Sequence, residues 1–337
     1  MKYLMVSTYP PMKCGIGTYA YQMTKKLQSS GNIVKVLTPK DGEGDFISNL
    51  RGGFNFLKIL RYATSYNKII IQYHESFYYT DKRKKNFLNV FATHISFYII
   101  FLLFHRKIEV IVHEFPKPDH SKIDYFFEKI KWYLCPILVF HTKKEVENFE
   151  AHYFKLSSKH YELRSPHEYY SKFKDITPKK AREELGIANN SVVFLCIGFI
   201  QPHKGFDRAI KAFQKINSSI MHLYVVGSLR INLGEYIDHL NKLRQMAEKN
   251  PNIHIKEMYL SDEDFDTWIS ASDVVIIPYR EIWSSAVLGR AKLFDKLVIA
   301  SDVGGLSDQL TDNDVLFKND DELEYVFREF SREIMQR

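Results

Sequence analysis

The sequence predicts an α/β protein with two doubly wound domains, each a parallel sheet with helices on both faces. Short apolar runs alternate with helical periods along the chain, which is typical of parallel sheets. The alternation restarts near residue 192, after a polar stretch at 165–178. A chain of 337 residues also exceeds what one hydrophobic core usually organises. We therefore expect domains at 1–168 and 169–318, followed by a helix at 319–337 that could pack back toward the first domain.

The predicted elements follow from the spacing of the apolar residues. In the first domain, strands are expected at 3–7, 33–37, 69–73, 110–112 and 137–140, and helices at 18–29, 54–65, 86–104, 122–133 and 143–154. In the second domain, strands are expected at 192–197, 222–226, 253–255, 274–277 and 298–300, and helices at 206–216, 235–248, 261–270, 285–294 and 321–335. Ligands of such sheets bind beyond the carboxyl ends of the strands, so the loops there are candidates for a site.

Cysteine usage indicates a reducing compartment. The three cysteines, Cys14, Cys135 and Cys196, are odd in number and far apart, which fits neither a disulfide framework nor a metal site. Two of them fall in apolar runs, where buried, reduced thiols are expected. The chain opens directly into a predicted strand, and we identify no signal peptide. These features favour a cytoplasmic protein.

Basic charge is concentrated in the first half of the chain. Residues 1–170 hold 25 Lys and Arg against 15 Asp and Glu, a net charge of +10, whereas the remainder carries −3. The excess includes the run Lys82, Arg83, Lys84 and Lys85, which precedes an apolar segment at 91–104. The run could be an ordinary solvated surface, and the apolar segment a core helix. The apolar segment is too short to span a bilayer, which needs ~20 apolar residues. Together with the basic run, it could instead form a peripheral contact with an anionic membrane.

Two glycine-containing loops follow predicted strands. Gly15 and Gly17 come after the first strand and before a helix, and Lys204 and Gly205 occupy the same place in the second domain. Glycines let a backbone approach a ligand closely, and the N–H groups of a helix start favour an anionic oxygen. Each loop alone could be only a tight turn. Together they favour binding of a diphosphate, although the spacing does not match the fingerprint of dinucleotide-binding dehydrogenases.

Four stretches together resemble a known family. They are residues 9–18, 198–213, 272–281 and 284–305, and they follow the order and spacing of the GT-B glycosyltransferases, in particular the retaining family 4 type that uses nucleotide sugars. The resemblance implies two Rossmann-like domains facing each other across a cleft, an acceptor-side domain first and a donor domain second. It also implies a nucleotide-sugar donor, UDP- or GDP-linked, as substrate, with no separate cofactor and no required metal.

The resemblance implies roles for individual residues. Donor binding is expected from Gly15, Gly17, Lys204, Gly205, Ser284, Ser285, Ala286 and Val287. The expected catalytic residues are His113 and Glu281: His113 follows a predicted strand where the family often has a histidine that contacts the sugar, and Glu281 lies one residue before the position of the family's first glutamate. His74 and Glu75 follow another strand and could contact the acceptor. Transfer with retention would proceed by front-face attack, the donor phosphate taking the acceptor proton.

Two departures from the family pattern bear on activity. The family often carries two glutamates seven residues apart, but the corresponding positions here are Ile282 and Arg290, with Glu281 one residue early. An arginine that pairs with the donor phosphates is often found where this chain has Phe199. The expected function is a glycosyltransferase that builds a cell-surface polysaccharide or glycolipid on a saccharide or lipid-linked acceptor, at the inner face of the membrane. The alternative is a catalytically weak homologue that serves as partner subunit of an active transferase. No nucleic-acid-binding module is recognised.

Overall fold

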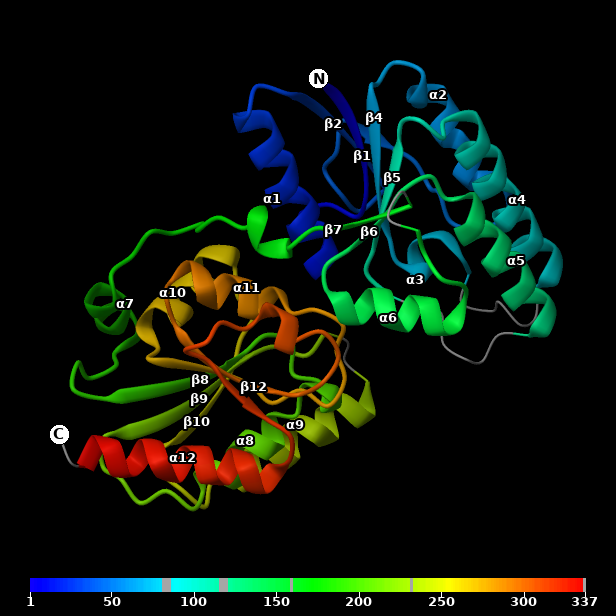
Figure 1. Cartoon of the computed structure of the whole chain (residues 1–337). Coiled ribbons are helices and arrows are strands. Elements are labelled where there is room, and N and C mark those ends of the chain that lie inside the picture. Colours follow the sequence, from blue (N-terminus) through cyan, green and yellow to red (C-terminus); the bar gives the residue numbers. More distant parts are fainter. Residues whose placement is uncertain (81–85, 115–120, 158–159, 231–232, 336–337) are drawn as a thin grey trace. The chain divides into compact units, whose positions relative to one another are not determined.

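The chain divides into two units, residues Met1–Tyr169 and Tyr170–Arg337. The computed structural model describes residues 1–80, 86–114, 121–157, 160–230 and 233–335, with the side chains of 333–335 left out. Each unit contains a sheet whose paired strands are all parallel, flanked by helices (Figure 1). The predicted α/β class with two parallel sheets is therefore confirmed.

The sheet of the first unit has seven strands among the described residues, in the order β3-β2-β1-β4-β5-β6-β7. The strands are β1 Lys2–Val6, β2 Ile33–Thr38, β3 Phe46–Ile47, β4 Lys68–Tyr73, β5 Ile108–Val112, β6 Leu138–Phe140 and β7 Tyr161–Leu163. The helices are α1 Gly15–Ser29, α2 Leu60–Ala63, α3 Glu75–Tyr78, α4 Phe87–Leu103, α5 Lys122–Leu134 and α6 Lys143–His152, with 3-10 turns η1 Gly53–Ile59 and η3 Pro166–Glu168. The central strands β4 and β5 read as continuous apolar runs because both faces of the sheet are covered.

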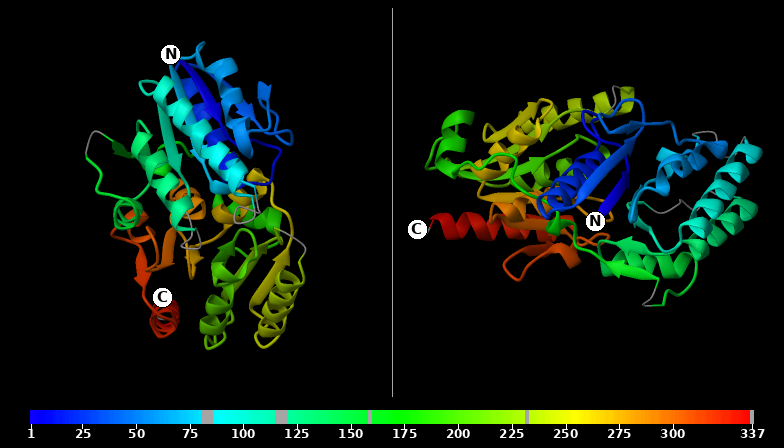
Figure 2. Two further views of the ribbon diagram at one scale, coloured as in Figure 1. Left: turned by 90° about the vertical axis from the view of Figure 1, so that its right-hand side faces the viewer. Right: turned by 90° about the horizontal axis from the view of Figure 1, so that it is seen from above.

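The helix expected at 54–65 is a 3-10 helix over most of its length. Residues Gly53–Ile59 form a 3-10 helix, and only Leu60–Ala63 are α-helical. Phe56 and Ile59, three residues apart, are both buried, which suits the three-residue turn of a 3-10 helix. The 3-10 helix η1 packs against α4, which lies along the flank of the sheet (Figure 2, left).

The sheet of the second unit has six strands in the part of the chain that the structure describes, in the order β10-β9-β8-β11-β12-β13. The strands are β8 Val192–Ile197, β9 Met221–Gly227, β10 Ile253–Glu257, β11 Val274–Ile277, β12 Leu297–Ser301 and β13 Val315–Phe317. The helices are α7 Pro178–Leu185, α8 Phe206–Phe213, α9 Gly234–Ala247, α10 Asp262–Ala271, α11 Ala286–Leu293 and α12 Asp320–Met335, with 3-10 turns η4 Pro202–Lys204 and η5 Ser307–Gln309.

Helices cover both faces of this second sheet. The larger core cluster joins the sheet to α8, α9 and α12, and a smaller one joins its other face to α7 and α10. The final helix α12 packs against α8 within this unit, with Phe327 close to Phe194 and Phe213. Across the described residues of both units, no helix is long and apolar enough to span a bilayer.

Candidate functional site

Loops of the second unit approach one another closely at the carboxyl edge of its sheet. The loop after β8 ends at Gly205, which has a left-handed backbone (φ +63°) and lies directly beside the carbonyl of Pro278, after β11. A Cβ at Gly205 would come within 2.0 Å of that carbonyl oxygen, so only glycine fits. A Cβ at Gly304, after β12, would come even closer, within 1.6 Å of the carbonyl oxygen of Ile282. Glycines therefore let the loops after β8 and β12 pack onto the loop after β11.

Lys204 lies at this edge, and none of the residues that the structure describes offers it an anionic partner. Its ammonium nitrogen sits 3.9 Å from the centroid of the Tyr279 ring, a cation–π contact. Among the described residues, no carboxylate or carbonyl oxygen lies within hydrogen-bonding distance of it. Burial lowers the pKa of Lys204 to about 8, because the charged form has lost water and gained no counter-charge. The lysine is a cation whose charge the protein itself leaves uncompensated.

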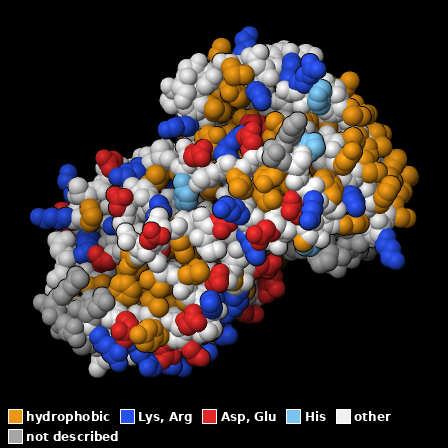
Figure 3. Space-filling view, viewed as in Figure 1, with side chains coloured by type: hydrophobic (Ala, Val, Ile, Leu, Met, Phe, Trp, Pro, Cys, Tyr) orange, Lys and Arg blue, Asp and Glu red, His pale blue; other side chains and the backbone are white. Residues whose placement is uncertain are grey.

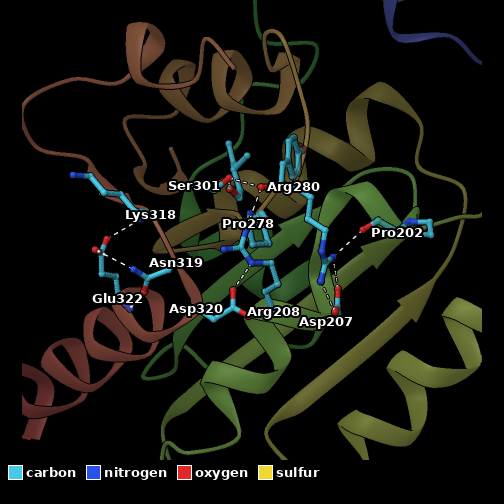
Figure 4. A network of polar contacts seen from close by, with 12 residues as sticks. Pro202, Asp207, Arg208, Pro278, Arg280, Ser301, Lys318, Asn319, Asp320 and Glu322 are labelled. Atoms are coloured by element: carbon cyan, nitrogen blue, oxygen red, sulfur yellow. Dashed lines mark hydrogen bonds and ion pairs between the residues drawn. The ribbon is translucent and has the colours of Figure 1, made fainter. Parts of the chain in front are cut away.

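Two arginines hold the loop that carries Lys204. Arg280 donates two hydrogen bonds to the carboxylate of Asp207 (2.8 and 2.7 Å) and one to the carbonyl of Pro202 (2.9 Å). Arg208 in turn donates to the carbonyls of Pro278 (3.1 Å) and Tyr279. Each arginine thus binds backbone oxygens of the other's loop, and we call this pair, Arg208 and Arg280, the arginine clasp (Figure 4).

The clasp extends to the final helix. Arg208 also pairs with Asp320, the first residue of α12, at 2.5 Å. Ser301, at the end of β12, donates to the carbonyl of Tyr279 at 2.6 Å. Although burial opposes ionisation of Asp207, the hydrogen bonds from Arg280 hold the pKa of this carboxyl below its ordinary value. The Lys204 loop and the Tyr279 ring beneath its ammonium are therefore fixed by charged contacts on several sides.

The start of α11 supplies backbone donors. Ser285 is the N-cap: its hydroxyl accepts a hydrogen bond from the amide of Leu288, and its own amide donates to Gln309. Ser285 thus caps the helix, and its contact with a donor stays a prediction. Ala286 and Val287 follow in the first turn, where amides have no intrahelical acceptor and favour anions. Ser284 precedes the cap and is half-buried.

Arg290 and Glu281, at or next to the positions where the resemblance would place two glutamates, lie in different environments. Arg290 is buried and pairs with Asp262 at 2.7 Å and Asp266 at 2.5 Å, which ties α11 to α10. Its guanidinium also lies over the Phe265 ring. Arg290 is therefore a packing residue. Glu281 is exposed, and the structure gives it no ion pair with the other described residues.

In the first unit, the predicted glycines differ from each other. Gly15 opens α1, and a Cβ there would meet nothing within 4 Å, so the space beside it is open. A Cβ at Gly17 would touch Thr8 at 3.4 Å, an ordinary packing contact. Donor contact by Gly15 and Gly17 stays a prediction, and the open space is on the Gly15 side.

His113, directly after β5, has a defined orientation. Its Nε2 lies 2.5 Å from Gln72 Oε1, which leaves Nδ1 as the acceptor of the ring. Burial, followed by the neighbouring His141 and His74, lowers the pKa of His113 well below its usual value. His141, after β6, lies 5.3 Å from His113 between ring centroids, and burial lowers its pKa to about 4. Both rings are neutral hydrogen-bonding groups, with Tyr19 of α1 packed edge-on against them.

His74 and Glu75 follow β4 at the same edge. His74 Nδ1 accepts from the amide and hydroxyl of Ser76, capping the short helix α3, which begins at Glu75. Its Nε2 pairs with Glu114 at 2.6 Å. Glu114 and His141 were not predicted, although each lies immediately after a strand, where a polar residue is a candidate. The strand ends therefore bring His74, His113, Glu114 and His141 to one edge of this sheet.

Other predicted features lie elsewhere. The basic run Lys82, Arg83, Lys84 and Lys85 falls outside the described residues. Within the described ranges, no three His, Cys, Asp or Glu side chains come together as metal ligands would. The three cysteines are free thiols, and burial raises the pKa of Cys135 and of Cys196.

Comparison with known proteins finds a family match within the second unit. Residues 178–330 match the family model described as glycosyl transferases group 1. This stretch contains Lys204, the arginine clasp and the start of α11. No characterised protein sequence matches the chain significantly.

Solved glycosyltransferase structures share the fold of the whole chain. Sucrose-phosphate synthase from Thermosynechococcus elongatus superposes with a TM-score of 0.71 at 15% identity, covering 98% of this chain and 89% of the other. HepE of Anabaena, in complex with UDP-glucose, gives 0.69 at 16% identity, with 99% and 91% covered. WaaG, a glycosyltransferase involved in lipopolysaccharide biosynthesis, gives 0.62 at 14% identity, with 98% and 90% covered. At these identities the likeness establishes the GT-B fold.

Proposed function

We propose that the protein is a glycosyltransferase, and that its second unit, which matches the family model of glycosyl transferases group 1, binds a nucleotide-sugar donor through Lys204. The observation that carries the proposal is the uncompensated charge of Lys204. A half-buried lysine normally has a carboxylate or carbonyl partner, because desolvating an ammonium ion is costly. Here the partner would be the diphosphate of the donor.

The neighbouring groups support this assignment. A leaving diphosphate gains negative charge, which a fixed cation and oriented amides stabilise without rearrangement. The amides of Ala286 and Val287, at the start of α11, can add backbone hydrogen bonds. In the proposed reaction, the bond from the sugar anomeric carbon to the diphosphate breaks and a bond to the acceptor oxygen forms on the same face. A donor phosphate oxygen takes the proton of the acceptor hydroxyl, and configuration is retained.

The acceptor is proposed to bind at the carboxyl edge of the first unit. Neutral His113 offers Nδ1 to a sugar hydroxyl, and the His74–Glu114 pair adds a hydrogen-bonding carboxylate. We propose a saccharide or lipid-linked acceptor in cell-surface polysaccharide or glycolipid synthesis, at the cytoplasmic face of the membrane. Two structural relatives support the proposal: WaaG is described as a glycosyltransferase involved in lipopolysaccharide biosynthesis, and HepE was solved in complex with UDP-glucose.

The test is a calorimetric titration of the full chain with UDP and, separately, GDP. We expect one of them to bind, and Lys204→Met to weaken that binding by roughly 1.5–3 kcal/mol, the loss of a charge-assisted contact. Lys211→Met, at an exposed lysine of α8, is the matched control and should bind as the wild type does. Equal affinity of wild type and Lys204→Met would remove Lys204 from the site.

A second function is motivated by Arg290. Where the family often has a glutamate, this chain has an arginine occupied by Asp262 and Asp266, so no carboxylate is available from that position. This favours a catalytically weak homologue acting as partner subunit of an active transferase. Such a partner would neither bind nucleotide nor hydrolyse nucleotide sugars, so the same titration, combined with a donor-hydrolysis assay, separates the two functions.

A further inference from the structure

Helix α5 has its charged residues inside and its apolar residues outside. Asp124, Glu128 and Lys131 lie on its buried side, spaced four and three residues apart. Ile123, Phe126 and Tyr133 lie on the opposite side and are 57, 58 and 75% exposed. A surface helix of a protein surrounded only by water shows the reverse arrangement.

The inward charges are fully accounted for inside the unit. Lys131 pairs with Glu128 at 2.9 Å and donates to the hydroxyl of Tyr73 at 2.6 Å. The second carboxylate oxygen of Glu128 accepts from Tyr153, and Asp124 pairs with His94. The buried side of α5 is thus a specific polar network, so its orientation is fixed and its apolar side must face outward.

Helix α4 continues the apolar surface. It contains no charged residue over its whole length, and its outer side carries apolar side chains at helical spacing. Leu88 and Leu102, at its two ends, are 77 and 62% exposed. The two helices are neighbours: Phe127 packs against Phe91 with ring centroids 5.0 Å apart, and the Tyr98 hydroxyl donates to the Phe127 carbonyl at 2.7 Å.

The outer sides of α4 and α5 therefore form one surface, which we call the α4–α5 face. Figure 3 shows hydrophobic side chains gathered over the flank of the first unit where Figure 1 places these helices. Contiguous apolar patches of this kind mark sites of interaction. The face is defined by Leu88, Leu102, Ile123, Phe126 and Tyr133.

The charge of the face indicates what covers it. On these two helices, both acidic residues point inward, and the exposed charged residues are Lys122 and Lys129 of α5. Arg106, just after α4, is also exposed. Aromatic and aliphatic side chains interleaved with lysines, without exposed acids, are typical of helices that lie in the interface of an anionic bilayer.

We propose that the α4–α5 face docks on an anionic lipid membrane. Both helices connect parallel strands: α4 comes after β4 and the short helix α3, and α5 comes after β5, so both begin toward the carboxyl edge of the first sheet. His74 and Glu114 lie at the same edge. The face would therefore bring that edge to the bilayer surface, where a lipid-linked acceptor is presented; this last step rests on the proposed function, whereas the docking itself does not.

The test is co-sedimentation of the full chain with vesicles of phosphatidylcholine, with and without phosphatidylglycerol. We expect binding to the anionic vesicles that weakens as salt is raised, since screening shortens the reach of the lysines. The triple variant Leu88→Gln, Leu102→Gln, Phe126→Gln should bind them at least tenfold more weakly. The matched control replaces exposed apolar residues of the second unit, Leu233→Gln, Ile237→Gln, Tyr325→Gln, and should bind as the wild type does.

Each other outcome is decisive. No binding of wild type to anionic vesicles, or equal binding of wild type and triple variant, overturns the proposal. A wild-type dimer in light scattering that the triple variant loses would assign the face to a second copy of the chain and also overturn it. A nucleotide titration of the same triple variant separates this proposal from the donor site, because its nucleotide affinity should be unchanged, whereas Lys204→Met should still bind vesicles.

Discussion

Two lysines, one in each unit, are buried in different ways. Lys131, on α5 of the first unit, is fully buried and surrounded by partners: a carboxylate, tyrosine hydroxyls and aromatic rings. Lys204, at the edge of the second sheet, contacts the face of Tyr279, and no described residue gives it a counter-charge. Both ammonium groups contact aromatic rings, but only Lys131 is paired with a carboxylate among the described residues.

The difference separates a structural charge from one that awaits a ligand. Burying an ammonium ion is tolerated when hydrogen bonds and a carboxylate compensate it, as they do for Lys131. An uncompensated charge on Lys204 lowers the free energy of unfolding, and destabilising features of this kind are found mainly at functional sites. The comparison predicts that removing the two lysines will have opposite consequences.

The largest effect is expected at Lys131. Lys131→Met leaves Glu128 buried without its cation, so the free energy of unfolding should fall by about 3–5 kcal/mol. Urea denaturation of the full chain, followed by tryptophan fluorescence, measures this loss. Adding Glu128→Gln should recover part of it, because the second change removes the stranded charge. A loss below ~1 kcal/mol in the single variant would show that the pair is not structural.

An intermediate effect is expected at the arginine clasp. Arg280→Ala frees the loop that carries Lys204, and nucleotide affinity should fall by about 1 kcal/mol, less than for Lys204→Met. Asp207→Asn keeps the shape of the carboxylate but removes its charge, and should weaken binding by a smaller amount. Calorimetry with the nucleotide that binds wild type measures both. If Arg280→Ala were as damaging as Lys204→Met, Arg280 itself would contact the donor.

The smallest effect is expected on stability at Lys204. Burial lowers its pKa from the ordinary 10.5 to about 8, so below pH 8 the folded state holds a cation that it disfavours. Lys204→Met should therefore unfold at pH 7 with an equal or higher free energy than wild type, and this difference should shrink between pH 8 and 10.5. Urea denaturation at pH 7 and pH 9.5 provides the comparison. Clear destabilisation at pH 7 would make Lys204 structural, like Lys131.

Local signals allowed much of the fold to be predicted and named part of the candidate site. The alternation of apolar runs gave the parallel sheets, and the lysine–glycine pair at a strand-to-helix junction indicated Lys204 and Gly205. Helix α7 was missed although Thr177 caps it, Pro178 begins it and Gly186 ends it. The edge strands β3, β7 and β13 have two or three residues, too few for a periodic signal.

The rest depends on contacts between distant residues. The ion pair Arg208–Asp320 joins positions 112 residues apart, so no local sequence pattern predicts it. The helix at α5 was predicted, but its periodicity does not say which side faces the core. Only the partners of Asp124, Glu128 and Lys131, contributed by other elements, reveal that the charged side is inside.

Proton uptake on nucleotide binding tests the central claim most directly. At pH 8 about half of the Lys204 side chains are neutral in the free protein, and a bound diphosphate should protonate them. Titrations with the bound nucleotide in two buffers of different ionisation enthalpy should show uptake of about half a proton per site by wild type. Lys204→Arg, which stays protonated, should bind with no uptake. Equal uptake by wild type and Lys204→Arg, or none by either, would contradict the claim that Lys204 is held for the donor diphosphate.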